Sequence, residues 1–194
     1  MKISEITKFN KDMSSTLTGR HTPDTKDLLI SKGYTYIDQG HYSATYLSPN
    51  QKTVLKINRD FDPGYEHFIK VIKSQPNAHF PTISDKKKLP DGTSAYIMER
   101  LYDLNHDDDT ILSLIKEANL NIGMGQLEQF KRTRKSAVEV LNTQQPGIIE
   151  ALQILSRYRG SFADDVRHDN IMKRKDGTVV IIDPYGPTIK NGMR

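Results

Sequence analysis

The stretch that decides the fold is Asp165-Val166-Arg167-His168-Asp169-Asn170, which precedes the apolar run Val179-Val180-Ile181-Ile182-Asp183. A carboxylate stands five positions before an asparagine, and another carboxylate ends the apolar run. Phosphoryl transfer needs these groups, because one carboxylate orients the attacking hydroxyl while an amide oxygen and a second carboxylate hold Mg²⁺ on the nucleotide phosphates. The turn sequence Lys175-Asp176-Gly177 predicts a β-hairpin that lets Asn170 and Asp183 face each other.

Length and composition favour a folded protein with a substantial core. The chain has 194 residues, of which 36% are hydrophobic and 27% charged, enough for one domain or two small lobes. No apolar run approaches membrane-spanning length, and the first residues have no apolar signal core, so we expect a cytoplasmic protein without a membrane partner. Cysteine is absent, which excludes disulfide scaffolds, thiol catalysis and thiolate zinc sites.

The charge pattern does not favour nucleic-acid binding. The formal net charge is only +4, from 28 basic and 24 acidic residues. The densest basic run, Lys131 to Lys135, contains no interleaved aromatic residue, so we interpret it as a solvated helix face. Nothing in the sequence indicates an oligomeric state.

Hydrophobic periodicity divides the chain into a short leading segment, a mostly β part and a mostly helical part. Residues 1–20 are rich in Ser, Thr and Lys and are expected to be weakly ordered. Thr22-Pro23 predicts a helix start and Gly33 its end. A two-residue alternation then predicts strands, with one helix between them; these strands are expected at 34–38, 42–47, 53–57, 80–83 and 95–98, and the helix at 65–74.

After residue 101 the predicted elements are mostly helices. They are expected from the acidic run Asp107–Asp109 onward, at 126–142 and at 147–158, before the hairpin. The fold class predicted from this order is α+β, with an antiparallel sheet at 21–101 and a mostly helical region at 102–194.

Three residues of the β part suit the binding of phosphates. Gly40 lies between two predicted strands, where a glycine lets backbone N–H groups approach phosphates, although a single glycine at this place by itself favours a plain turn. Lys56 lies within a strand, where a lysine needs an anionic partner or must extend to solvent. Glu66, ten residues later, is a candidate partner for Lys56, or else an ordinary acid of a first helical turn.

The order of these features resembles the eukaryotic-type protein kinase fold over roughly residues 33–186: glycine turn, strand lysine, helix glutamate, catalytic loop and hairpin aspartate. More closely, the segments "GHYSATY…VLKIN" and "DDVRHDNIM…VVIIDP" are similar to the early serine/threonine protein kinases of the T-odd (T-seven-like) bacteriophages. That family phosphorylates host proteins during infection. The resemblance therefore implies a phage protein that acts in the host cytoplasm on host proteins and on itself.

The resemblance also implies ATP and Mg²⁺ as cofactors and a role for each matching residue. Residues for the nucleotide would be Gly40 and Ser43 in the phosphate loop, Lys56 on the phosphates, Glu66 holding Lys56, and Met98, Glu99 and Leu101 against the adenine. Residues for the transfer would be Asp165 as proton acceptor, Arg167 as a cation beside the transferring phosphoryl group, and Asn170 and Asp183 as Mg²⁺ ligands.

Several positions depart from the usual kinase pattern. The glycine loop keeps only its middle glycine, with Asp38 and Ser43 in the outer places, and Ala163-Asp164 replaces the usual His-Arg. Asp183-Pro184-Tyr185 stands in place of Asp-Phe-Gly, and the chain ends at Arg194 without an activation segment. The expected architecture is thus a minimal two-lobe, protein-kinase-like fold with a C-terminally truncated helical lobe.

Two other functions fit the same pattern. A catalytically inactive kinase-fold protein that binds and inhibits a host protein would tolerate the missing glycines. A small-molecule kinase of the aminoglycoside or sugar type would tolerate Asp-Pro, but it would normally carry long helical insertions. Because Lys56, Asp165, Asn170 and Asp183 are all retained, the protein kinase is the leading hypothesis.

Overall fold

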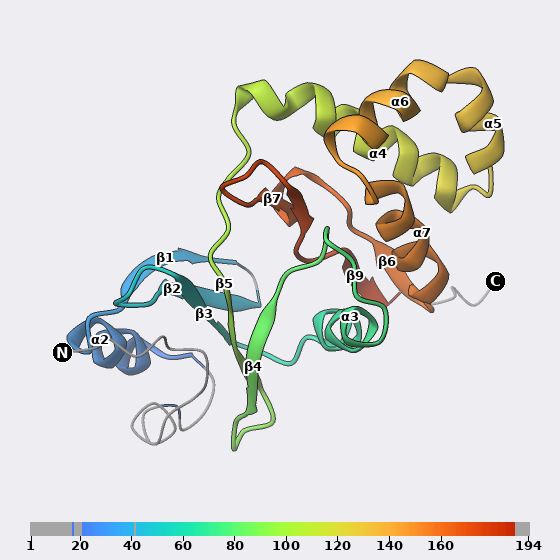
Figure 1. Cartoon of the computed structure of the whole chain (residues 1–194). Helices are drawn as coiled ribbons and strands as arrows, with labels where there is room; N and C mark the ends of the chain where they lie inside the picture. The colour runs from blue at the N-terminus through green and yellow to red at the C-terminus, as the bar shows by residue number, and fades with distance from the viewer. Residues whose placement is uncertain (1–16, 18–20, 41, 189–194) are drawn as a thin grey trace. The chain divides into compact units, whose positions relative to one another are not determined.

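The computed structural model describes residues 17, 21–40 and 42–188, and the chain forms two compact units (Figure 1). Unit 1 comprises residues 1–62 and 82–100, and unit 2 comprises residues 63–81 and 101–194. One boundary falls between residues 100 and 101, and the helix-bearing stretch 63–81 groups with unit 2. The predictions for residues 1–16 and 18–20 lie outside the described residues.

Unit 1 is built on an antiparallel sheet of five strands in the order β1-β2-β3-β5-β4. Their bounds are β1 (Thr35–Gln39), β2 (Ser43–Leu47), β3 (Thr53–Asn58), β4 (Ile83–Lys88) and β5 (Ser94–Glu99). Helix α2 (Pro23–Ser31) precedes them. Thr22 caps it by accepting a hydrogen bond from the N–H of Thr25 at 3.3 Å, as its sequence predicts.

One face of this sheet carries the core of unit 1. Every second side chain of β2, β3 and β5 is buried in one cluster, which also contains Leu17, Leu29 of α2 and Leu89. The cluster residues of the strands are Ala44, Tyr46, Leu55, Ile57, Ala95 and Ile97. Burying a large apolar side chain stabilises the fold by about 1.5–3 kcal/mol. Because Leu55 and Ile57 face this cluster, Lys56 lies on the opposite face.

Unit 2 contains five helices among its described residues: α3 (Pro63–Ser74), α4 (Asp109–Gly123), α5 (Leu127–Thr133), α6 (Lys135–Gln144) and α7 (Ile148–Tyr158). Two single 3-10 turns, η1 (His106–Asp108) and η2 (His168–Asn170), lie among them. In the part of the chain that the structure describes, none of the helices has the length and apolar character that crossing a membrane requires.

The strands of unit 2 form two small ribbons. The predicted hairpin is confirmed, because β7 (Ile171–Lys173) pairs antiparallel with β8 (Val179–Ile181). The other ribbon, β6 (Phe162–Asp164) with β9 (Tyr185–Thr188), was not predicted from the sequence. The structure thus confirms an α+β chain with an N-terminal antiparallel sheet and a helical region.

Two expected elements were wrong. The strand expected at 80–83 begins only at Ile83 and runs to Lys88, because Phe80 is buried edge-on against Phe68 of α3 instead. The single helix expected at 126–142 is broken at Arg134, whose φ is −119° and ψ is 41°. Its guanidinium pairs with Glu117 of α4 through two contacts of 2.9 Å, an interaction between distant residues that the local pattern does not reveal.

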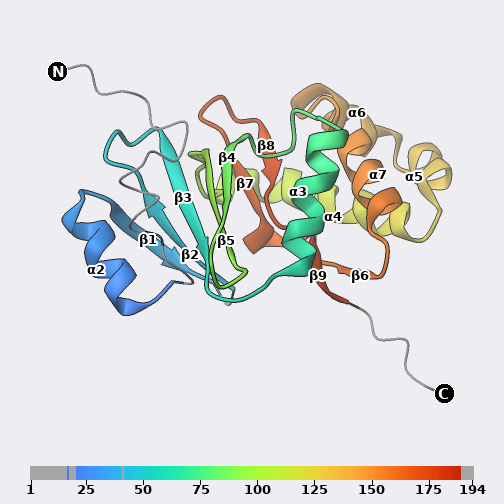
Figure 2. The ribbon, with the colours of Figure 1, turned by 90° about the horizontal axis from the view of Figure 1, so that it is seen from below.

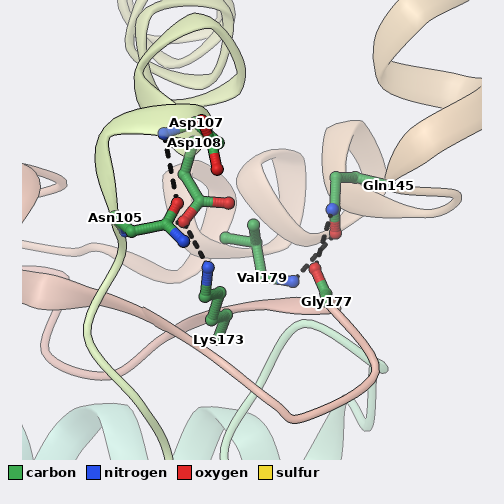
Figure 3. A network of polar contacts seen from close by, with 7 residues as sticks. All are labelled: Asn105, Asp107, Asp108, Gln145, Lys173, Gly177 and Val179. Carbon is green, nitrogen blue, oxygen red and sulfur yellow. Dashed lines mark hydrogen bonds and ion pairs between the residues drawn. The ribbon is translucent and has the colours of Figure 1, made fainter.

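Side chains from two other segments, Asp108 of η1 and Gln145 after α6, contact the β7–β8 hairpin (Figure 3). Lys173 contacts the Asp108 carboxylate at 2.5 Å. Burial alone would raise the pKa of Asp108, but its bonds to Lys173 and to the Asn105 N–H outweigh burial, so the pKa is lowered. Gln145 accepts from the Val179 N–H at 2.8 Å and donates to the Gly177 carbonyl at 3.0 Å.

Candidate functional site

The loop Asp165–Asn170 connects β6 to β7, and both of its ends are joined to the segment that carries Asp183. At the start of the loop, the N–H of Asp165 donates to the Pro184 carbonyl at 2.8 Å. At its end, the carbonyl of Asn170 accepts from the N–H of Ile182 at 2.9 Å. Asp183 lies between these two contacts, so the backbone of unit 2 brings Asp165, Asn170 and Asp183 together, as the sequence predicts.

The Asn170 side chain is fixed by Asp165. Its Nδ2 donates to the Asp165 carbonyl at 2.8 Å and to Oδ2 of the Asp165 carboxylate at 2.9 Å. Because both of these neighbours are acceptors, only the amide nitrogen can occupy that position. The amide oxygen of Asn170 therefore points to the other side, which is the orientation that a metal ligand requires.

Arg167 contacts the other oxygen of the same carboxylate. Its Nε lies 3.1 Å from Oδ1 of Asp165, and the arginine side chain is 63% exposed. An ion pair this exposed contributes only about 0–1 kcal/mol, so the guanidinium can move to another anion at little cost. The structure thus groups Asp165 with Asn170 through hydrogen bonds and with Arg167 through an ion pair.

Metal binding here would depend on few protein ligands. Among residues 17, 21–40 and 42–188, no group of three or more His, Asp or Glu side chains gathers as a metal site. Mg²⁺ is commonly held by one or two protein oxygens together with water and phosphate oxygens. The chemistry of Asn170 and Asp183 fits such a site, and fits a fully protein-coordinated ion less well.

Asn119 is a residue of this region that sequence reasoning missed. It lies within α4, is 9% exposed, and donates from Nδ2 to Oδ2 of Asp164 at 2.7 Å. The other oxygen of Asp164 accepts from the N–H of Val166 at 3.2 Å. Asp164 thus ties the loop to α4 immediately before Asp165. A polar residue within an otherwise apolar helix face could have indicated a role for Asn119. No feature of the sequence indicates that its partner is Asp164, 45 residues away.

A small hollow lies beneath this loop. It is lined by residues of α4 and α7 and by Asp164, Val166, Pro184 and Tyr185. Its cavity volume of about 10 Å³ accommodates roughly one water molecule, too little for a nucleotide or a sugar.

Lys56 lies in the middle strand of the unit 1 sheet. Thr45 of β2 and Tyr96 of β5 are its cross-strand neighbours. Val54 and Met98 are paired one step along the same face and are both buried. Lys56 itself is half-buried, so an apolar strip surrounds the stem of its side chain. Its expected pairing with Glu66, a residue of α3 in unit 2, stays a prediction.

The residues expected in the phosphate loop flank the β1–β2 connection. Gly40 follows β1 and Ser43 begins β2. Among the described residues, a Cβ placed on Gly40 would meet only the Ser43 carbonyl oxygen, at 3.9 Å, and the φ of Gly40 is not in the left-handed region. The exposed Asp38 accepts from the N–H of Gln39 at 2.7 Å.

The residues expected beside the adenine lie at the end of β5. Met98 is 6% exposed. Glu99 accepts with its carboxylate from the N–H of Thr82 at 2.7 Å, and its own N–H donates to the Thr82 carbonyl at 3.0 Å. Glu99 is therefore engaged with the segment before β4, while Leu101 begins the second stretch of unit 2. The adenine contact of all three stays a prediction.

No protein-family model matches the chain, and no curated protein shows significant similarity to it. The resemblance to kinases therefore rests on the sequence motifs and stays an expectation.

Proposed function

We propose that this protein is an ATP- and Mg²⁺-dependent serine/threonine protein kinase with a minimal kinase-like fold, similar to those of the T-odd bacteriophages, that phosphorylates host proteins and itself. The observation that carries this proposal is the grouping of Asp165, Arg167 and Asn170 beside the backbone of Asp183. These groups meet the needs of phosphoryl transfer to a hydroxyl: a carboxylate, a mobile cation, and two oxygen ligands for a metal.

In the proposed reaction a Ser or Thr hydroxyl donates its hydrogen bond to the Asp165 carboxylate. As the new O–P bond forms, the proton passes to Asp165, the bond from the γ-phosphorus to its bridging oxygen breaks, and ADP leaves. Arg167 moves from Asp165 to the transferring phosphoryl group and stabilises its charge. Asn170 and Asp183 would hold Mg²⁺, which would supply positive charge to neutralise the phosphates.

Unit 1 supports the proposal by two features of its sheet. Lys56 presents an ammonium from an apolar strip, which suits the α- and β-phosphates of ATP. Among the described residues, the nearest atom to a Cβ placed on Gly40 is the Ser43 carbonyl oxygen at 3.9 Å, which leaves room on that side for a ligand to approach the backbone. The proposal retains the nucleotide-binding roles that the resemblance implies for five further residues: Ser43, Glu66, Met98, Glu99 and Leu101.

Transfer of labelled phosphate tests the proposed function. Purified protein is incubated with Mg²⁺ and γ-labelled ATP, alone and with bacterial lysate, beside Asp165→Asn and Lys56→Ala. We expect labelled protein with the wild type and a loss of label in both variants. Nucleotide binding without transfer would favour the inactive host-binding protein. Label that appears only on an added aminoglycoside or sugar would favour a small-molecule kinase.

A further inference from the structure

The first turn of α3 lies directly on the backbone of β9, within unit 2 (Figures 1 and 2). A Cβ placed on Gly64 would lie 2.6 Å from the Tyr185 carbonyl oxygen and 3.4 Å from that of Gly186. Carbon and oxygen do not approach to 2.6 Å without strong repulsion, and a backbone carbonyl cannot rotate away as a flexible side chain can. Only glycine therefore permits this distance between α3 and β9.

Tyr185, two residues after Asp183, is held from several sides. The residue is 4% exposed, and its hydroxyl donates to the Leu155 carbonyl of α7 at 2.8 Å. Its ring stacks on Phe162 with centroids 6.1 Å apart and meets Phe68 of α3 edge-on at 6.2 Å. The preceding carbonyl, of Pro184, accepts the N–H of Asp165. One short segment thus contacts α3, α7, β6 and the loop of Asp165.

We propose that Gly64 and Tyr185 are positioning residues for the transfer reaction, an assignment that rests on the proposed function. Their contact joins α3 to the segment that carries Asp183, so that the place of this carboxylate relative to Asp165 depends on how closely the first turn of α3 approaches. Glu66 follows Gly64 by two residues in the same turn, so its backbone is set by the same contact. Neither Gly64 nor Tyr185 touches the reacting atoms in this account.

Substitution of Gly64 by alanine tests the contact. The added methyl group must push α3 and β9 apart, which displaces Asp183 from Asp165. We expect kcat to fall by about tenfold or more, since a misplacement of about 1 Å can cost 10²-fold. The Mg²⁺ concentration for half-maximal rate should rise several-fold, a change that a mere loss of folded protein would not produce.

Two further variants separate positioning from folding. Gly123→Ala makes the same chemical change at the end of α4, where a Cβ would meet no atom of the described residues within 4 Å, and should leave kcat and the Mg²⁺ dependence unchanged. Tyr185→Phe keeps the ring and removes only the hydroxyl bonded to Leu155. Like Gly64→Ala, it should raise the Mg²⁺ concentration for half-maximal rate. Circular dichroism at the assay temperature checks that the variant is folded.

A readout without catalysis distinguishes this inference from the proposed function. Hydrogen exchange of the Asp165 amide, which donates to Pro184, should be at least tenfold faster in Gly64→Ala than in Gly123→Ala. If the wild type transfers no phosphate but this exchange increases, the proposed function fails and the contact stands. If Gly64→Ala matches Gly123→Ala in exchange, in kcat and in Mg²⁺ dependence, the positioning role is overturned.

Discussion

Within the part of the chain that the structure describes, no contact or backbone angle of Gly40 requires a glycine. Its φ lies outside the left-handed region, and a Cβ there would meet its nearest described neighbour, the Ser43 carbonyl, at 3.9 Å. We therefore expect Gly40→Ala to unfold at the same denaturant concentration as the wild type. The Michaelis constant for ATP should nevertheless rise several-fold, because a methyl group would stand between the backbone and the phosphates. An unchanged Michaelis constant would remove Gly40 from the nucleotide site.

His21 gives unit 1 a pH-dependent stability. Its Nε2 is hydrogen-bonded to the hydroxyl of the buried Tyr46, and burial, with the nearby charges of Arg59 and Lys26, lowers the pKa of the imidazole from its ordinary value of 6.5. The unfolded chain then binds the proton more readily than the folded one. Stability is therefore full above about pH 6.5 and decreases as the pH falls below it.

Urea unfolding between pH 7.5 and 5.5 measures this effect. The wild-type unfolding free energy should decrease more steeply toward low pH than that of His21→Gln, which cannot take up the proton. Equal slopes in the two proteins would exclude His21 as the source.

At the scale of elements, the β7–β8 hairpin depends on one glutamine. The Gln145 side chain, 8% exposed, satisfies the Val179 N–H and the Gly177 carbonyl at the end of the hairpin. Gln145→Ala leaves the buried Val179 N–H without its partner, so we expect a loss of about 1–3 kcal/mol in unfolding free energy. Gln144→Ala, at an exposed position one residue earlier, should change stability by less than about 0.5 kcal/mol. Equal losses would contradict this role of Gln145.

The elements that local patterns define were predictable. Thr22 directly precedes α2 and Gly33 follows its end. The two-residue alternation indicates β1, β2 and β3, and the Asp176-Gly177 turn indicates the hairpin. The misplaced elements depend on contacts between distant residues. Arg134 interrupts the expected helix and pairs with Glu117. Phe80 lies outside the observed strand and packs against Phe68. Ribbon β6–β9 joins two strands of three and four residues, too short for periodicity to reveal.

At the scale of the whole molecule, the candidate site was predictable only where its residues are close in sequence. Asp165, Asn170 and Asp183 span a single loop and hairpin, so spacing and turn chemistry bring them together. The contact of Gly64 with Tyr185 joins positions over a hundred residues apart, and no local rule marks it. The positions that hold the site in place were therefore hidden from the sequence, while those assigned to the chemistry were visible.

The initial rate of phosphate transfer from ATP to protein, compared between two matched variants, decides whether Asp165 is the proton acceptor of a kinase. Asp165→Asn keeps the shape of the side chain but removes the proton acceptor, and Asp169→Asn makes the same change at a 79% exposed neighbour. A kinase of the proposed kind loses about 10²–10⁴-fold in rate with the first change and retains its rate with the second. Equal rates in both variants, or no transfer by the wild type, would contradict it.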